Sequence, residues 1–412
     1  MGHGGIVLAH GLITLACLTA AASVEEQVSL AGTWRFRVDA ADAGIREEWF
    51  RQNLPDEVRL PGAMAEGGYG DGVTADTRWT GTVVNRMWHE EDRFAKYRDP
   101  GNTKIMFWLQ PDKYYVGPAW YQRDVDIPES FRGKRVTLLL ERCHWETQVW
   151  VDDTAAGSQN SLTTPHEYDL SAALTPGPHR LTIRVDNTVK IAVGPDAHSV
   201  SDNTQGNWNG ITGTIALIAR DPVWMNDIQV YPNLVNNTAK VCVKISNQTG
   251  VPAVGTLTLA ARSWNGAVEH APAPLEVPVD ASAATAEVTA EYPLGDGAQY
   301  WSEFAPNLYE LTATLDTDAA GGSHKDTKSV NFGMREFAAN GTRFTLNGSP
   351  IFLRGTLECC IFPLTGYPPA DLESWLRVLN VAKAHGLNHI RFHSWCPPEA
   401  AFDAADKLGV IF

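Results

Sequence analysis

The sequence predicts a mainly β protein of several domains: a jelly roll, then an immunoglobulin-like β-sandwich, then the start of a truncated (β/α)8 TIM barrel. With 412 residues, the chain is too long for one ordinary domain. Short apolar segments with period-2 alternation, separated by turn residues, recur from about residue 28 to 335. After about residue 340, helical periods alternate with strand-like segments, which is typical of a parallel sheet.

Residues 28–220 favour a jelly roll because short strands follow one another without helical periods between them. In the segment "HRLTIRVDN", Leu181, Ile183 and Val185 alternate with polar residues, which predicts a half-buried strand. The stretch between residues 65 and 105 is rich in glycine and charge, and we interpret it as long loops.

Residues 221–335 form a second β unit. In "AKVCVKISNQTG" the alternation predicts that Val241, Val243 and Ile245 point inward. About 110 residues of such strands fit one immunoglobulin-like sandwich. The Cys-Trp-Cys pattern of antibody domains is absent from this stretch.

Residues 340–412 change to a strand–helix pattern. "FTLNGSPIFLRG" predicts a hairpin, "LNHIRF" a buried strand and "VIF" the start of another strand. Two helices are expected between them, ending at Gly386 and Gly409, with the apolar faces Leu372, Trp375, Leu376, Leu379 and Ala382, and Ala401, Phe402, Ala405 and Leu408. A closed barrel needs eight such strands, so we expect the sequence to be truncated within its last domain.

Charge and composition restrict the partners. The net charge of −15 and a pI near 5.2 argue against nucleic acid, which requires clustered Lys and Arg. The apolar residues 1–23 are typical of a secretory signal peptide and predict a periplasmic or secreted protein, and no other stretch is long enough to span a membrane. The cysteines, including the adjacent Cys359 and Cys360, lack the spacing of a disulfide framework or a zinc site, so no metal or cofactor is expected.

Several segments, taken in order, resemble glycoside hydrolase family 2, the group of β-galactosidases, β-glucuronidases and β-mannosidases. These segments are "GPAWYQRDVDIP", "VWVDD" with "PHEYDLSAAL" and "PGPHRLTIRVDN", "NWNGITGTIAL", "WSEFAPNLYEL" with "FGMREF", "FTLNGSPIFLRG" and "IRFHSWCPPEAAFDAADKLGV". The resemblance covers nearly all of residues 28–412. It implies that the first domain is the family's sugar-binding domain.

The resemblance further implies a retaining exo-β-glycosidase that acts on a carbohydrate substrate, with a homo-oligomer as one form that the full-length enzyme could take. Such enzymes use two carboxylic acids about 5–5.5 Å apart, one as nucleophile and one as acid/base. In the family both are glutamates on later barrel strands, so we expect no catalytic residue in this chain and no hydrolysis by it. The alternative is a non-catalytic carbohydrate-binding β-sandwich protein, which the 14 tryptophans favour.

Two groups of residues are candidates for substrate binding. By resemblance, Arg391 and His393 match polar residues after the second barrel strand, and Trp395 follows them. The stretch "HSVSDNTQGNWNG" contains the candidates Asp202, Asn203 and Trp208, on a loop that reaches the barrel in the family's β-galactosidases. Structural alternatives stay open: a satisfied histidine, a buried tryptophan and an Asx turn. The family's histidine-rich stretch is replaced by "LECCIFP", which leaves the sugar open, including a uronide.

Overall fold

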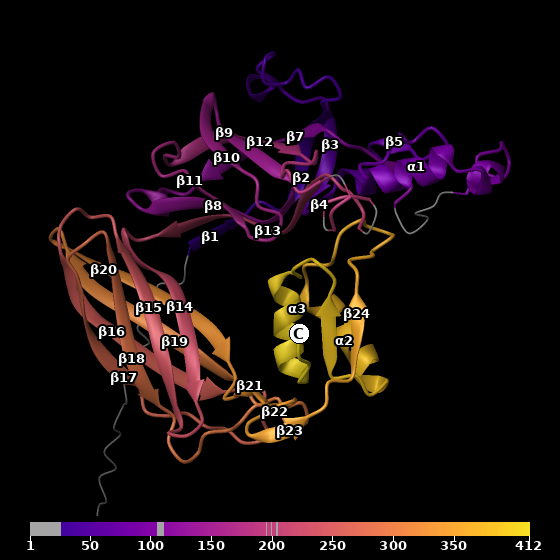
Figure 1. Ribbon diagram of the computed structural model, residues 1–412. Coiled ribbons are helices and arrows are strands. Elements are labelled where there is room, and N and C mark those ends of the chain that lie inside the picture. Colours follow the sequence, from indigo (N-terminus) through magenta and orange to yellow (C-terminus); the bar gives the residue numbers. More distant parts are fainter. Residues whose placement is uncertain (1–25, 105–110, 195, 199, 203–204) are drawn as a thin grey trace, which may run out of the picture.

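The computed structural model describes residues 26–412 except 105–110, 195, 199 and 203–204. The predicted signal peptide therefore lies outside the described residues. The described chain is mainly β and forms an N-terminal β region (26–220), a second β region (223–335) and a C-terminal region (337–412). Figure 1 shows the last part of the C-terminal region, which includes α2 and α3, in yellow, below the N-terminal β region and beside the second one. No helix in these described ranges is long and apolar enough to cross a membrane.

Two antiparallel sheets build the N-terminal β region. The first runs β1 (Glu26–Ser29), β13 (Gly210–Arg220), β8 (Arg135–His144) and β11 (His166–Asp169), with β4 (Gly62–Ala63) also paired to β13. The second runs β10 (Thr154–Gln159), β9 (Glu146–Val151), β12 (Gly177–Asp186), β7 (Pro118–Ile127), β2 (Gly32–Val38) and β3 (Asp56–Leu60). The residues predicted to point inward from β12, Leu181, Ile183 and Val185, are fully buried between the sheets.

The strand β12 is buried on both faces, so the prediction of a half-buried strand is wrong. Thr182 and Arg184 on its other face are buried as well. The chain after β2 folds back over this face, where Trp49 and Phe50 of a 3-10 helix (Trp49–Arg51) pack with Trp120 and Trp150 of the sheet. Apolar burial on this second face stabilises the sheet beyond what the alternation alone provides.

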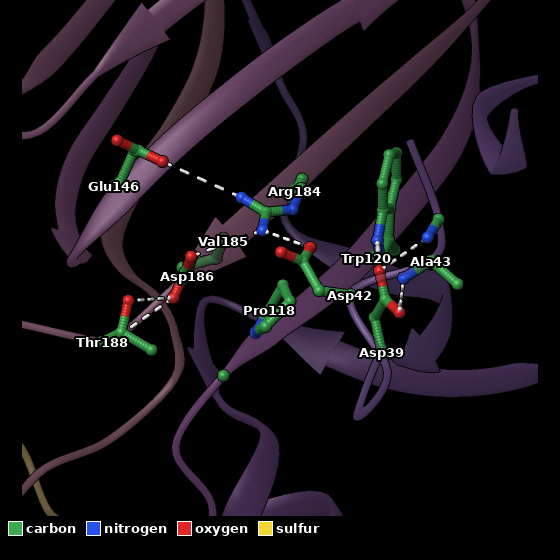
Figure 2. Close-up of polar contacts among 12 residues, drawn as sticks. Asp39, Asp42, Ala43, Pro118, Trp120, Glu146, Arg184, Val185, Asp186 and Thr188 are labelled. Carbon is green, nitrogen blue, oxygen red and sulfur yellow. Dashed lines mark hydrogen bonds and ion pairs between the residues drawn. The ribbon is translucent and has the colours of Figure 1, made fainter. Parts of the chain in front are cut away.

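Polar contacts fix this covering segment at both ends of its turn (Figure 2). The carboxylate of Asp39 accepts hydrogen bonds from the backbone N–H of Ala43 at 2.7 Å and from Trp120 Nε1 at 2.9 Å. Asp42 forms an ion pair with Arg184 at 2.7 Å. Gly44 packs so closely on the Trp120 ring that a Cβ would lie 2.5 Å from its Nε1, so only glycine fits there.

The stretch 65–105 is not all loop. It contains α1 (Thr82–Glu90), with Val84 and Trp88 buried on one face, and a 3-10 helix at Asp92–Tyr97. The prediction missed α1 because its apolar face is short and is flanked by charged and glycine-rich sequence. The other small elements are 3-10 helices at Met64–Gly67 and Glu129–Phe131 and the pair β5 (Asp71–Gly72) and β6 (Lys113–Tyr114).

The second β region also consists of two antiparallel sheets around one core. The first runs β14 (Val223–Asn233), β15 (Thr238–Asn247) and β18 (Thr285–Pro293), and the other β17 (Leu275–Ala281), β16 (Ala253–Ser263), β19 (Tyr309–Ala319) and β20 (Gly322–Phe332). The inward direction predicted for Val241, Val243 and Ile245 is confirmed, since all three are buried in this core.

The C-terminal region begins with the antiparallel strands β21 (Phe337–Asn340), β22 (Arg343–Leu346) and β23 (Ser349–Ile351), of which β22 and β23 are the predicted hairpin. The strands β24 (Gly355–Glu358) and β25 (His389–Phe392) then pair in parallel, and Ile411 extends this pairing as a parallel bridge to His389. The helices α2 (Leu372–Ala384) and α3 (Glu399–Leu408) pack on one face of the pair.

The ends of the two helices lie where the sequence predicted them, but some residues predicted to be buried are exposed. Gly386 and Gly409 adopt the predicted left-handed conformation, with φ of 79° and 74°. Phe402 and Leu372 are exposed, and Ala404 is buried in place of Phe402. In β25 only Ile390 is buried, because described residues cover just one face of the parallel pair.

Candidate functional site

The candidate site lies where the chain leaves the two parallel strands. The backbone N–H of His393 donates to the carbonyl of Glu358 at 2.8 Å, and Trp395 Nε1 donates to the same carbonyl at 3.3 Å. These bonds bring the segments after β24 and β25 together. The carboxyl ends of parallel strands are where barrel enzymes build their sites.

Glu358 is the carboxylic acid at this point. Its Oε2 accepts a hydrogen bond from the backbone N–H of Cys360 at 2.9 Å, and this bond lowers the pKa of Glu358 by less than burial raises it. Burial raises the pKa of Glu358, because the charged form loses water. The turn is completed by Cys360 in the left-handed conformation, at φ 57°.

Arg391, His393 and Trp395 have different surroundings. Arg391 is exposed on the open face of the strand pair, and its side chain has no hydrogen-bond partner within the described part of the chain. His393 is half-buried, and its ring lies 4.3 Å, centre to centre, from the ring of His198. Trp395 packs edge-on against Phe392, with ring centres 5.1 Å apart. Of these three, Arg391 has the side chain most available to a ligand.

Two arms from the N-terminal β region touch these segments. The loop between β12 and β13 supplies His198 and Gln205, whose Nε2 donates to the His393 carbonyl at 3.3 Å. The strand β8 supplies Arg142, whose Nη2 donates to the Cys396 carbonyl at 2.7 Å. The N-terminal β region therefore forms one wall of the candidate site.

Asp202 lies inside the N-terminal β region. Its carboxylate accepts hydrogen bonds from the Thr80 N–H at 2.6 Å, the Thr80 hydroxyl at 2.7 Å and the Tyr114 hydroxyl at 2.7 Å. Burial raises the pKa of Asp202, and these donors oppose the rise. The residue thereby ties its loop to the segments around α1 and β6. Asn203, the neighbouring candidate, lies outside the described residues.

Trp208 is also enclosed. Its ring stacks on His144 and packs on Tyr367, with ring centres 5.2 Å away in each case, and it is 7% exposed. Its carbonyl bonds to His144 Nδ1 at 2.8 Å, and burial lowers the pKa of this histidine to about 4. The Tyr367 hydroxyl donates a hydrogen bond to the Glu66 carboxylate at 2.7 Å. Trp208 thus lies at the contact between the N-terminal β region and the C-terminal region.

The sequence interpretation missed Arg142, His198, Gln205 and Tyr367. His198 and Gln205 lie in the loop stretch already singled out, where only the acidic, amide and indole side chains were considered. Arg142 gives a signal of its own, because an arginine inside the apolar strand "VTLLLERCHW" is unusual for a buried position. The described residues hold no group of three or more His, Cys, Asp or Glu side chains placed to bind a metal ion.

Comparison with known proteins finds similar glycosidases. The chain is 26% identical over 386 residues to a β-galactosidase of Arthrobacter sp. (strain B7), covering 90% of this chain and 35% of the relative. It is 23% identical over 401 residues to a β-glucuronidase of Paenibacillus borealis, covering 93% and 57%. The fold is shared with the β-glucuronidase of Ruminococcus gnavus in complex with D-glucuronic acid, at TM-score 0.67, 19% identity and coverage of 95% and 60%. These relatives are glycosidases.

A family model gives a more specific match over part of the chain. Residues 223–335 match the model of glycosyl hydrolases family 2. A family 2 member from Bacteroides cellulosilyticus DSM 14838 shares the fold at TM-score 0.67 and 20% identity, covering 94% of this chain and 47% of that one. The resemblance to glycosyl hydrolase family 2 that the motifs predicted is confirmed, and the similarity to these glycosidases covers most of the chain. It spans between 35% and 57% of the length of the two curated relatives named above.

Proposed function

We propose that this chain is the N-terminal part of a retaining exo-β-glycosidase. The N-terminal β region would be its jelly-roll sugar-binding domain, the second β region its immunoglobulin-like sandwich and residues 340–412 the first units of its (β/α)8 barrel. The observation that best supports this proposal is that similarity to curated glycosidases extends over 90% or more of the chain, through all three regions. Export is part of the proposal and rests on the apolar residues 1–23.

The geometry supports a substrate-binding role at the strand ends. Arg391 presents a free guanidinium on the open face, beside the half-buried His393. A guanidinium at this position can orient a catalytic carboxylate, and an imidazole can bond to sugar hydroxyls. We assign the catalytic glutamates to later barrel strands outside residues 1–412, as in the rest of the family. The sugar is galactose-like or glucuronic-acid-like.

The test compares the 412-residue chain with a protein extended along its reading frame. We expect the extended protein to hydrolyse a nitrophenyl β-galactoside or β-glucuronide with retention of the anomer, observed by NMR of the first product. The 412-residue chain should hydrolyse neither. Activity of the shorter chain, or no activity in an extended protein that contains strand-end glutamates, would contradict the proposal. A stop codon after Phe412, with sugar binding by residues 26–335 alone, would favour the non-catalytic alternative.

A further inference from the structure

The sequence contains four Asn-Gly pairs, and their surroundings in the structure differ. The asparagines of these pairs are Asn209, Asn265, Asn340 and Asn347. In such a pair the backbone nitrogen of the glycine can attack the side-chain amide carbon of the asparagine, because glycine has no Cβ to hinder the approach and its backbone bends readily. Asparagine is among the thermolabile residues of proteins. The attack requires an asparagine side chain that is free to turn towards the next backbone nitrogen.

Asn209 and Asn265 are held in place by hydrogen bonds at their side-chain amides. Asn209 is 2% exposed, accepts a hydrogen bond from the Tyr121 hydroxyl at 2.8 Å and donates one to the Val185 carbonyl at 3.0 Å. The Asn265 amide donates to the Lys407 carbonyl at 2.8 Å. Each side chain must break these bonds before it can reach the next backbone nitrogen, so the free energy of local opening slows the reaction.

Asn340 and Asn347 occupy the two turns of one sheet, β21–β22–β23, and only Asn347 is held. Its Oδ1 accepts the Glu336 N–H at 2.9 Å, and its Nδ2 donates to the Trp301 carbonyl at 2.9 Å. Asn340 ends β21, is exposed, and its side chain has no hydrogen-bond partner among the described residues. A Cβ built on Gly341 would meet no atom within 4 Å, so this turn has open space for a ring to form.

We propose that Asn340 is a site of spontaneous deamidation, and the only one of the four pairs that reacts while the protein is folded. The Gly341 nitrogen forms a bond to Cγ of Asn340 and gives up its proton. The bond between Cγ and Nδ2 breaks, and ammonia leaves with that proton. Water then opens the resulting succinimide ring at either carbonyl and yields aspartate or isoaspartate. Water is the only co-reactant, and nothing is oxidised or reduced.

The products alter the hairpin of β21 and β22. Asn340 pairs with Arg343 across a turn of two residues, and either product places a new negative charge beside this arginine. Isoaspartate also carries the main chain through the former side chain, which adds one CH₂ group to the backbone. Because the length of the turn fixes the register of a hairpin, this addition should loosen the pairing of the two strands. The inference does not depend on the proposed glycosidase function.

The first experiment follows the folded 412-residue chain at mildly alkaline pH by peptide mass spectrometry. Incubation in water enriched in heavy oxygen labels each product, so conversion during later digestion in ordinary water is told apart. We expect Asn340 to convert at least about tenfold faster than each of the other three asparagines. A factor of ten requires only about 1.4 kcal/mol of local opening free energy at those positions.

The same incubation in urea that unfolds the chain is the internal control. The hydrogen bonds that hold the other three asparagines are then lost, so all four pairs should react at similar rates. Asn340→Gln should abolish conversion at this position, because its longer side chain does not form the succinimide ring. This variant should unfold at the same temperature as the wild type, since the replaced side chain is exposed.

The second experiment measures hydrogen exchange in the converted protein after its separation by anion exchange. Exchange should be faster in β21 and β22 than in the unconverted protein and unchanged in β14 and β15, which serve as the reference strands. Equal exchange in both forms would overturn the expected loosening of the hairpin.

Three results would overturn the site itself. One is conversion of Asn340 in the folded chain no faster than that of Asn347. Another is a rate at Asn340 that rises more than about tenfold in urea, since the folded hairpin would then protect it as well. The third is slow conversion of Asn340 in the protein extended along its reading frame, since further residues would then cover the turn. These results leave the glycosidase proposal to its own hydrolysis assay.

Discussion

The β12–β7 sheet and the β24–β25 pair contrast in how many of their faces the described chain covers. Helices or strands pack on one face of each. The other face of β12–β7 is closed by the segment carrying Trp49 and Phe50. The corresponding face of β24–β25 presents Leu357, which is 50% exposed, together with Arg391. The first arrangement provides stability, and the second leaves side chains free to meet a ligand or further protein.

The largest effect that would sharpen this contrast comes from Trp120→Ala. It removes a fully buried ring from the covered face and leaves Asp39 without the indole donor at 2.9 Å. We expect the free energy of unfolding of the N-terminal β region to fall by about 3–5 kcal/mol, measured by urea denaturation. A loss below about 1 kcal/mol would mean that the covering segment adds little stability.

A smaller effect is expected for Glu303→Gln, at the joint between the second β region and the C-terminal region. The Glu303 carboxylate accepts hydrogen bonds from Arg354 at 2.9 Å and Asn388 at 2.7 Å, and it is 11% exposed. The change should destabilise the C-terminal region by about 1.5–3 kcal/mol, because the negative charge that strengthens both hydrogen bonds is lost. Hydrogen exchange should speed up in β24 and β25. Unchanged exchange there would show that the open strand pair does not depend on this contact.

The pH dependence of the ion pairs of Asp124, on the inner strand β7, gives a still smaller effect. Hydrogen bonds from Arg35, and then from Arg180, lower the pKa of Asp124 to about 2. Because the folded-state pKa is below the unfolded value, this ion pair stabilises the protein above about pH 4 and the contribution disappears as the pH falls towards 2.

Asp124→Asn tests this contribution. It should reduce stability at pH 7 by up to about 1 kcal/mol, because the side chain is 57% exposed and solvent weakens the pair. The variant and the wild type should converge in stability near pH 2. Stability is measured by thermal denaturation at each pH. A difference between variant and wild type that stays constant across this range would show that the effect comes from packing and not from the ion pair.

The smallest effect is expected for Leu357→Ala on the open face. Since half of the side chain is already in solvent, stability should change by no more than about 0.5 kcal/mol. Ile390→Ala, on the covered face of the neighbouring strand, is the matched control and should cost about 2–5 kcal/mol. Similar losses for both variants would mean that the two faces of the strand pair are equally buried, against the contrast drawn above.

Local pattern predicted much of the fold. Alternation assigned the inward side of β12 and β15, and glycine marked the ends of α2 and α3, because these features depend on neighbours along the chain. The burial of Thr182 and Arg184 could not be predicted, since it depends on the fold-back of a segment about 130 residues earlier. The helix α1 was missed because its short apolar face stands in charged sequence.

The site was predicted less completely than the fold. Motif order placed Arg391, His393 and Trp395 after one strand. The structure has His393 and Trp395 there, whereas Arg391 lies within β25. The enclosure of Asp202 and Trp208 depends on partners from distant segments, Thr80, Tyr114 and Tyr367, and no spacing in the sequence reveals such partners. The position of Arg142 beside Trp395 joins residues more than 250 positions apart.

The joint formed by Glu66 with Tyr367 and by Arg142 with Cys396 has a consequence for protein engineering. A chimera that exchanges the N-terminal β region for that of a relative would also replace half of each of these contacts. If the boundaries of the exchanged segment are chosen from the linkers alone, the two sides of this joint will come from different proteins and will not fit. A working hybrid therefore needs the loops after β24 and β25 transferred together with the donor's β8.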